Sequence, residues 1–416
     1  MGKFNLGDSL NLNIPDSFKN LNPFSGRGPQ AKLGLDIGTR YIKMAMLHAS
    51  SQGIQLSKYG FSATPVGAIT EGTMNNPEAI GEAIWQILTH YKIKEKRVLC
   101  SLPGRAVIIR QVSIPGGLPE KEIKQATISE VERFLPFPMD EMEYTYHKLG
   151  EISQGDVKQQ SVLFVAAHKD SVQRRVEAAR FAGLESVEID VDPFVILRSV
   201  MESSLVEEPD TFSQTILLLD MGASATNVSI IHAGFLRFTR IFAIGGDTLT
   251  HAIESGYDAT YLEAEKLKME KGVAVLDEEV MEIDDEMREI HEMISTHLDT
   301  LALEIRRSLA YYTSKYRGES VTQIILTGGG SLLRGVGRFF EDDLGIPVSF
   351  GNPLQNIPYI GDGDIQSLAR LVPFQGIAVG LALRQVPQRM LARYTIDVGI
   401  EPNYEFGSTA QAGGAS

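Results

Sequence analysis

LGLDIGTRYIKMAML, at residues 33–47, and LLLDMGASATNVSII, at residues 217–231, decide the fold. Each stretch has an apolar run, an aspartate, a glycine two residues later, a polar turn and a second apolar run, which is the pattern of a β-hairpin. An internal repeat of this kind is stronger evidence of architecture than a single motif. The sequence therefore predicts two related lobes, each opening with a hairpin.

The two hairpin turns are typical of a phosphate site. Asp36 and Asp220 each end a strand, and Gly38 and Gly222 follow two residues later. Glycine lets the backbone approach a ligand closely, and successive N–H groups in such a turn bind anions. A single Asp-x-Gly turn is more often an ordinary turn, but two copies across one cleft favour phosphates with Mg²⁺ held by Asp36 and Asp220, partly through water. The donors expected from the turns are Gly38, Thr39, Arg40, Gly222, Ala223 and Ser224.

A third element is LTGGGSLLRGV, at residues 326–336. Its glycines leave a flat backbone surface for a purine and ribose, and the serine after them is expected to cap the following helix. The predicted contacts are Gly328, Gly329, Gly330 and Ser331. By itself, a glycine run after a strand is a weak signal. Neither the Rossmann pattern GxGxxG nor the P-loop pattern GxxxxGK[ST] occurs in the chain, which excludes the P-loop motor ATPases.

Composition limits the partners. The 416 residues include 39 Lys and Arg and 53 Asp and Glu, a formal charge of −14, which disfavours nucleic acid or a bare anionic membrane as the main partner. The single cysteine, Cys100, cannot form an internal disulfide, as expected in a reducing cytoplasm. No stretch approaches the roughly 18 apolar residues of a membrane span, and the N-terminus lacks a secretory signal. Membrane attachment is therefore expected only through partners.

Composition and periodicity also divide the chain. The N-terminal arm is predicted to be flexible because it is rich in Asn, Gly, Ser and Pro. A unit of about 75 residues is predicted to be inserted into the first lobe, and the acidic stretch before residue 318 has the periodicity of long helices. The predicted division is an arm (1–30), a first lobe (31–107, 183–214 and 373–392), an inserted subdomain (108–182), a second lobe (215–257 and 318–372), a helical subdomain (258–317) and a C-terminal tail (393–416).

The three motifs together resemble those of a known superfamily. The two hairpins are similar to the first and second phosphate motifs of actin, Hsp70 and hexokinase, and ILTGGGSLLRGV is similar to their adenosine motif. This resemblance implies an α/β, actin-like (ribonuclease H-like, duplicated) two-lobed fold that binds ATP and Mg²⁺. The segment AEKLK, at residues 264–268, resembles the AE-x-x-K segment of the FtsA and MreB branches, which implies that Glu265 and Lys268 contact the sugar and base. The alternative is an ordinary ion pair on a solvated helix.

The predicted inserted subdomain shows which branch of the superfamily the chain resembles. SLPGRAVIIRQVSIP (101–115), EVERFLPFPMDEMEY (130–144) and VDPFVILRS (191–199) resemble the SHS2-type insertion shared by FtsA and PilM, and residues 132–144 are similar to the PilM family of type IV pilus assembly proteins. The likeness covers about residues 31–390. It implies a cytoplasmic, ATP-binding scaffold at the inner membrane. The implied partner is the cytoplasmic N-terminal segment of the bitopic protein PilN, which pairs with PilO, with the pilus motor ATPases nearby. The resemblance leaves open whether the protein also forms a homo-oligomer.

Two departures from the superfamily concern hydrolysis. By resemblance to Hsp70, Asp192 takes the place of a carboxylate near the metal and the attacking water. The second phosphate motif ends in an acid in that relative, whereas Asn227 stands here and cannot act as a general base. Ala223 also replaces a glycine that is common in the stronger ATPases. We therefore expect ATP binding with at most slow hydrolysis.

Three other functions stay open at this point. One is an FtsA-like division protein, although the tail ending GSTAQAGGAS lacks the amphipathic basic helix typical of FtsA. The second is a small-molecule kinase of the same superfamily, which fold alone does not exclude. The third is a filament-forming actin homologue.

Overall fold

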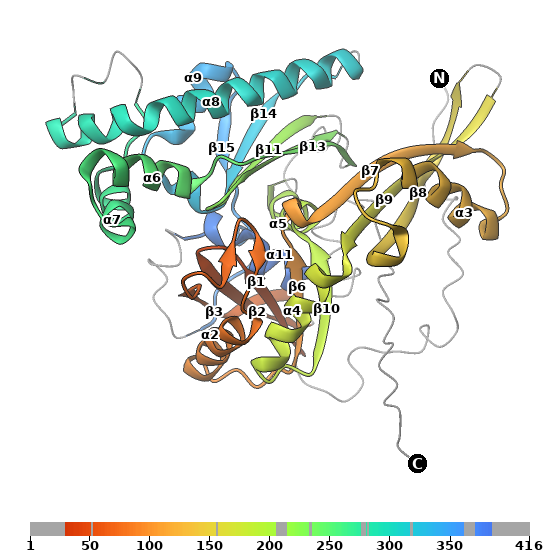
Figure 1. Ribbon diagram of the computed structural model, residues 1–416, viewed down its shortest axis with the longest axis horizontal. Helices are drawn as coiled ribbons and strands as arrows, with labels where there is room; N and C mark the ends of the chain where they lie inside the picture. The colour runs from red at the N-terminus through yellow and green to blue at the C-terminus, as the bar shows by residue number, and fades with distance from the viewer. Residues whose placement is uncertain are drawn as a thin grey trace.

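The computed structural model describes residues 30–50, 53–154, 157–204, 214–232, 235–275, 280, 283–316, 319–361 and 371–384. Within them, two five-stranded sheets build two lobes, and a three-stranded sheet projects from one side (Figure 1). The segments predicted as arm and tail lie outside the described residues, apart from residue 30.

The first sheet begins with an antiparallel meander and continues with two parallel strands. Its strands, in spatial order, are β10 (Ser186–Val191), β6 (Arg97–Leu102), β1 (Gln30–Ile37), β2 (Tyr41–Ser50) and β3 (Gly53–Ala63). The predicted hairpin of residues 33–47 is the β1–β2 pair. Strand β6 runs parallel to both β1 and β10, and its residues from Val98 to Leu102 are buried, as is typical of a central parallel strand.

The second sheet repeats this arrangement. In the same spatial sense its strands are β15 (Val348–Phe350), β14 (Gln323–Thr327), β11 (Thr215–Met221), β12 (Thr226–His232) and β13 (Phe235–Phe242). Strands β11, β12 and β13 form the meander, and β14 and β15 follow in parallel. The duplication predicted from the repeated hairpin therefore extends to the whole sheet.

Two helices cover the outer face of the first sheet. Helix α2 (Pro77–His90) starts with the side chain of Asn76 accepting from the amide of Ala79 at 3.0 Å, and with proline at its first position. Helix α4 (Lys169–Phe181) packs against α2 in the core of this lobe. The buried side chains of α2 include Ile80, Ala83, Ile84, Ile87 and Leu88, as its periodicity predicts.

The projecting unit has its own small core. It consists of β7 (Val107–Pro115), β8 (Met142–Gln154), β9 (Val157–His168) and α3 (Glu120–Val131), with the strand order β7-β9-β8. Residues from its sheet and from α3 share one hydrophobic cluster. Helix α4 lies within the predicted bounds of the inserted subdomain, and it also buries Val172, Ala178 and Ala179 in the core of the first lobe. The predicted domain boundaries stay a proposal.

Helices on the second lobe share one core with its sheet. They are α6 (Gly246–Tyr257), α7 (Tyr261–Lys271), α8 (Asp285–Lys315) and α9 (Val336–Leu344). Helix α8 spans the top of the molecule in Figure 1 and confirms the long helix predicted before residue 318. Its N-terminus is capped by Asp284, whose side chain accepts from the amide of Met287 at 2.9 Å. The apolar stripe of α8 faces the sheet and shares a cluster with Leu217 and Leu219.

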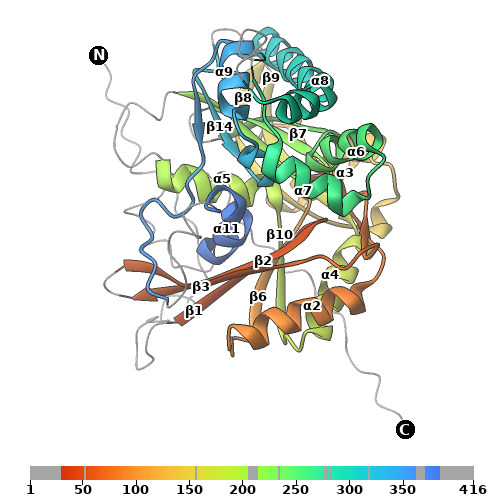
Figure 2. The same cartoon turned by 90° about the vertical axis from the view of Figure 1, so that its left-hand side faces the viewer.

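Two helices lie between the lobes. Helices α5 (Asp192–Ser204) and α11 (Gly376–Arg384) pack on each other, and Figure 2 places them between the two sheets. Their cluster joins Leu99 of the first sheet to Leu218 and Ile325 of the second. Helix α11 also packs on β1 and β2, as expected for a last helix that closes back on the first lobe.

The remaining elements are short. They are β4 (Ile69–Thr70), β5 (Thr73–Met74) and the 3₁₀ turns η1 (Gly104–Ala106), η2 (Glu132–Phe134), η3 (Met139–Glu141), η6 (Gly329–Leu332) and η7 (Pro373–Gln375). Among the helices of the described ranges, none combines the length and the apolar character that a bilayer span requires.

Candidate nucleotide-binding site

A cavity of about 500 Å³ lies in the cleft between the lobes. Both hairpin turns, the glycine run and helices α6 and α7 contribute to its walls, so elements far apart in the sequence meet here. The predicted site residues that line it are Asp36, Gly38, Thr39, Arg40, Asp192, Asp220, Gly222, Ala223, Ser224, Glu265, Lys268, Gly328, Gly329 and Gly330.

The two hairpins hold their aspartates in equivalent ways. In the β1–β2 register Asp36 lies opposite Lys43, and in the β11–β12 register Asp220 lies opposite Asn227. Directly opposed side chains on one face of an antiparallel pair contact each other. Lys43 Nζ accordingly lies 2.5 Å from Asp36 Oδ2, and Asn227 Nδ2 donates to Asp220 Oδ2 at 3.1 Å.

The turns leave backbone donors open toward a ligand. The amide of Gly38 donates to the oxygen of Tyr41 at 3.1 Å, and the amide of Gly222 donates to the oxygen of Ala225 at 2.9 Å. The next two amides of each turn, those of residues 39–40 and 223–224, donate to no other group within the described part of the chain. Unpaired N–H groups in consecutive turn positions form an anion-binding concavity.

The hairpin tips also join the two lobes. Thr39 Oγ1 and Ser224 Oγ lie 3.3 Å apart across the cleft. Arg40 Nε donates to Asp247 Oδ1 at 2.7 Å, and the Arg40 guanidinium lies 3.9 Å from the centre of the Tyr261 ring. The Arg40 side chain, predicted as a phosphate donor, is therefore engaged with α6 and α7, which leaves its backbone amide as the nearer candidate for that role.

Three carboxylates form one end of the cavity. Asp36 and Asp220 are buried, and Asp192, at the start of α5, is half-buried with its Oδ1 atom shielded from solvent. Burial raises the pKa of Asp220. Burial and then the neighbouring charge of Asp36 raise the pKa of Asp192 to about 8. A cation placed among these groups would relieve their repulsion.

The same end carries two cations that the sequence analysis missed. Besides contacting Asp36, Lys43 places its Nζ atom 4.5 Å from the centre of the Phe374 ring. Arg175 of α4 is buried and lines the cavity. Two features of the sequence could have identified them. Lys43 follows Asp36 by seven residues in the same hairpin, and Arg175 lies on the apolar face of a helix that also carries Val172 and Ala179.

The carboxylate end fits Mg²⁺. Asp192 Oδ1 is buried and has no hydrogen-bond partner among the described residues, as expected for an atom that meets a metal or its water. The described residues contain no group of three or more His, Cys, Asp or Glu side chains arranged around one point. Mg²⁺ keeps several waters and binds phosphate oxygens with one or two carboxylates, so Asp36 and Asp220 would be enough as its protein partners.

The glycine run has one position with room for a side chain. Gly328 has a φ of +83°, and a Cβ there would lie 2.6 Å from Asp220 Oδ1. A Cβ on Gly330 would lie 2.8 Å from the Met221 side chain, whereas one on Gly329 would lie 3.5 Å from the ring of Phe374, an ordinary contact. Gly328 and Gly330 are therefore required by the fold, while Gly329 is free to serve a ligand.

Ser331 does not take the predicted place. It is buried, does not line the cavity, and its hydroxyl donates to the oxygen of Gly328 at 2.7 Å. The glycine run continues into the 3₁₀ turn η6, and α9 begins only at Val336, with Gly335 at its N-cap. Ser331 is therefore a turn-stabilising residue, and the prediction that it caps a helix is wrong.

Glu265 and Lys268 line the cavity as a tightly held pair. Lys268 Nζ donates to Glu265 Oε2 at 2.6 Å, to Thr250 Oγ1 at 2.7 Å and to the oxygen of Gly246 at 2.9 Å. These three bonds use all three ammonium protons. The pair thus ties α7 to α6 at the nucleoside end, and its predicted contact with sugar and base stays a prediction.

The comparisons with known proteins agree with one family. A sequence model described as "Type IV pilus assembly protein PilM" matches residues 34–386. The chain belongs to the PilM family. The solved "PilM-PilN type IV pilus biogenesis complex" contains a chain that is 30% identical, with a TM-score of 0.74, and the match covers 86% of this chain and 100% of that one.

More distant relatives of this PilM family member show the same fold. The crystal structure of the ethanolamine utilization protein EutJ from Carboxydothermus hydrogenoformans matches with a TM-score of 0.50 at 14% identity, covering 86% of this chain and 90% of that one. The predicted actin-like fold class is therefore confirmed. FtsA of Bacillus subtilis is 23% identical over 53% of this chain, and the chain spans about half (52%) of that relative. FtsA of Streptococcus pneumoniae is 24% identical over 77% of this chain and 75% of its own length.

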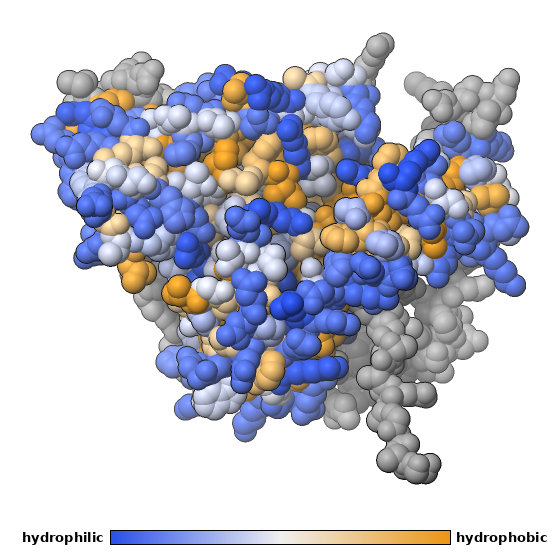
Figure 3. Space-filling model, viewed as in Figure 1, coloured by the Kyte–Doolittle hydropathy of each residue, from blue (hydrophilic) through white to orange (hydrophobic). Residues whose placement is uncertain are grey.

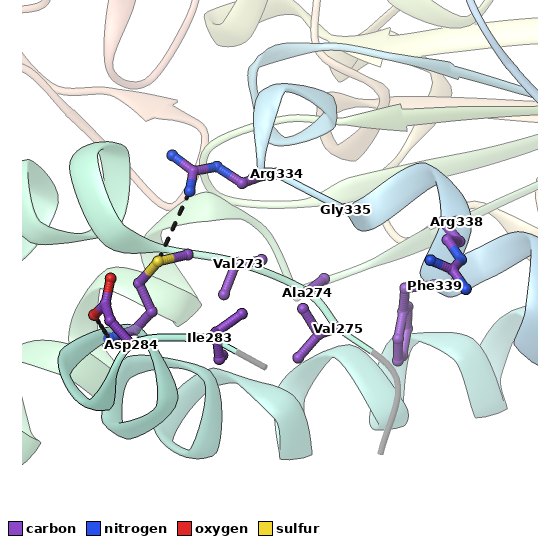
Figure 4. Close-up of a pocket in the computed structure, with 10 residues that line it drawn as sticks. Val273, Ala274, Val275, Ile283, Asp284, Arg334, Gly335, Arg338 and Phe339 are labelled. Atoms are coloured by element: carbon purple, nitrogen blue, oxygen red, sulfur yellow. Dashed lines mark hydrogen bonds between the residues drawn. The ribbon is translucent and has the colours of Figure 1, made fainter. Parts of the chain in front are cut away.

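A second cavity, of about 520 Å³, lies beside α8 (Figure 4). Its wall is mainly apolar, with Val273, Ile283 and Phe339 among the lining residues. Arg334 borders both this cavity and the cleft, and its Nη1 atom lies 3.8 Å from Met287 Sδ. None of the predicted site residues lines the second cavity, so in this member of the PilM family the predicted phosphate-binding residues belong to the cleft.

Proposed function

We propose that this chain is an ATP-binding scaffold of the type IV pilus inner-membrane assembly platform. Membership of the PilM family supports the pilus role, and the duplicated Asp–Gly hairpins around one cavity support ATP as the ligand. The open turn amides and Lys43 would bind the phosphates, and the glycine run would receive the nucleoside. Bound Mg²⁺ would neutralise phosphate charge beside Asp36 and Asp220.

The proposed partner is the cytoplasmic N-terminal segment of PilN. The observation that carries this assignment is the 30% identical chain solved in a complex described as PilM-PilN. In this proposal the chain works on the cytoplasmic face of the inner membrane and reaches the membrane through PilN, which pairs with PilO close to the pilus motor ATPases.

The cleft and the inserted sheet are directly connected. The turn η1 lines the cavity and leads into β7, while β9 leads into α4, which carries Arg175. Arg105 of η1 donates from Nη1 to the oxygen of Ser224 at 3.5 Å. Both ends of the inserted unit therefore adjoin the proposed nucleotide site. In the proposed function ATP closes the lobes, fixes the position of this unit and thereby sets its affinity for the partner segment.

The inserted unit offers apolar surface to a partner. Phe134 and Phe137, in the segment that resembles the PilM family, are both about half exposed. Figure 3 shows apolar side chains gathered near β7 and β13, between hydrophilic surroundings. Exposed apolar patches with a polar rim mark protein interaction sites.

The test of this function is a binding assay with a synthetic peptide of the cytoplasmic N-terminal segment of the PilN from the same organism. Fluorescence anisotropy should show saturable binding to the ATP- and Mg²⁺-loaded protein, and a scrambled peptide should not bind. Absence of binding by the loaded protein would remove the partner assignment.

Hydrolysis is expected to be slower than about one turnover per minute, because a missing general base typically costs about 10²–10⁴ in rate. Asn227 cannot accept a proton, and burial, followed by the charge of Asp36, raises the pKa of Asp192, which disfavours its ionised form in the ligand-free chain. Single-turnover assays with and without the partner peptide measure the rate. Asp192→Ala should leave ATP and peptide binding nearly intact. If the peptide drives hydrolysis to several turnovers per second, the protein is a working ATPase and the scaffold function fails.

A further inference from the structure

Arg175 is a buried cation at the edge of the cleft. It lies in α4, its side chain is 3% exposed, and it lines the cavity. Its hydrogen bond within the described part of the chain runs from Nε to the backbone oxygen of Ser101 at 2.7 Å. No carboxylate of that part forms an ion pair with it.

An unpaired buried charge is costly, because the ion loses its hydration and gains no counterion. Burial lowers the pKa of Arg175, while the charges of Asp192 and Asp36 act on it from a longer distance. If Arg175 served only to hold the oxygen of Ser101, an uncharged donor would do so at a lower desolvation cost. The remaining guanidinium donors therefore point to an anion that the ligand brings.

The position of Arg175 in the cavity indicates which part of a bound nucleotide it would contact. It shares the end of the cavity with Asp36, Asp192 and Asp220, whereas Gly329 and the Glu265–Lys268 pair contribute from the second lobe. A nucleotide whose Mg²⁺ lies between Asp36 and Asp220 presents its terminal phosphate at the carboxylate end. Guanidinium is suited to this contact, because its fork of donors matches the oxygens of a phosphate.

We propose that Arg175 binds the terminal phosphate of the nucleotide and makes the cleft prefer a triphosphate over a diphosphate. This inference rests on the proposed ATP function and adds a specificity-determining residue to it. ADP lacks the group that Arg175 would contact, so Arg175 should contribute to the affinity for ATP and hardly to that for ADP.

The test compares Arg175→Met and Arg175→Lys with Arg174→Met. Arg174 is the adjacent residue on α4, and its side chain is partly exposed and pairs with Asp170 at 2.7 Å, so it is a matched control. Isothermal titration gives Kd for ATP and for ADP, each with Mg²⁺. Arg175→Met should weaken ATP binding by about 10- to 100-fold, as expected for losing charge-assisted hydrogen bonds, and ADP binding by less than about twofold. Arg174→Met should change neither.

The outcomes separate this inference from the function on which it rests. If the unsubstituted protein binds neither nucleotide, the ATP-binding function itself fails. If it binds ATP and Arg175→Met weakens ATP and ADP equally, or neither, the assignment of Arg175 is overturned. Melting of the ligand-free proteins checks the fold. Should Arg175→Met melt well below the unsubstituted chain, the affinities are measured well below its melting temperature, where an unchanged preference for ATP contradicts the assignment and a reduced one supports it. Arg175→Lys keeps the charge but loses the fork of donors, so its preference for ATP should lie between those of Arg175→Met and the unsubstituted protein.

Discussion

ATP binding is expected to weaken in Gly329→Val by up to about a hundredfold, because overpacking of this kind costs about 1–3 kcal/mol. Gly329 is the position of the glycine run where a Cβ meets only an ordinary contact, 3.5 Å from the Phe374 ring, so the substitution should spare the fold. The branched side chain would instead occupy the space proposed for the purine. Isothermal titration with ATP and Mg²⁺ measures the loss.

The control for this variant is Gly329→Ala, which adds only the Cβ and should weaken ATP binding less. Circular dichroism and thermal melting of the ligand-free proteins verify that both variants fold. Unchanged ATP affinity in correctly folded Gly329→Val would remove the assignment of the glycine run to the nucleoside.

The second large effect is expected for Asp220→Ala, which should weaken binding of ATP·Mg²⁺ and of the partner peptide together. Asp220 is buried, is held by Asn227 at 3.1 Å and faces Asp36 across the cleft. Removing a metal-site group costs at least about 10–100-fold in metal affinity. Because the peptide affinity depends on the closed lobes in the proposed function, it should fall with the nucleotide affinity.

Two controls separate the metal effect from a general loss of structure. In EDTA, the difference in ATP affinity between Asp220→Ala and the unsubstituted protein should become small. Asp285→Ala, at the exposed start of α8, should change neither affinity, since the Asp285 side chain is 92% exposed. Equal ATP affinities with Mg²⁺ present would contradict the role of Asp220.

Local patterns predicted much of the fold. Both hairpins could be predicted from their Asp-x-Gly turns. The turn residues and the flanking apolar runs that define a hairpin lie within about 15 residues of each other. The long apolar stripe of α8 was likewise visible from its period. The assignment of residues 169–181 to the inserted unit stays a prediction, because a helix pattern shows which face is buried and not which element buries it. In the folded chain α4 packs on α2, about 90 residues earlier.

The sequence predicted those cavity-lining residues that belong to a recognisable motif. Residues from both hairpins and from the glycine run line one cavity, as expected from their order. Lys43 and Arg175 were missed because their roles depend on strand register and on packing between elements. The side chain of Arg40 pairs with Asp247, more than 200 residues later, and no local pattern encodes that contact.

The central claim is that ATP closes the lobes and thereby sets the affinity for the PilN segment. The most direct measurement is the Kd of the PilN peptide for the nucleotide-free protein and for the protein loaded with ATP and Mg²⁺. We predict peptide binding at least about tenfold tighter to the loaded protein, a coupling of about 1.4 kcal/mol. Equal affinities in the two states, with ATP bound in one of them, would contradict the account.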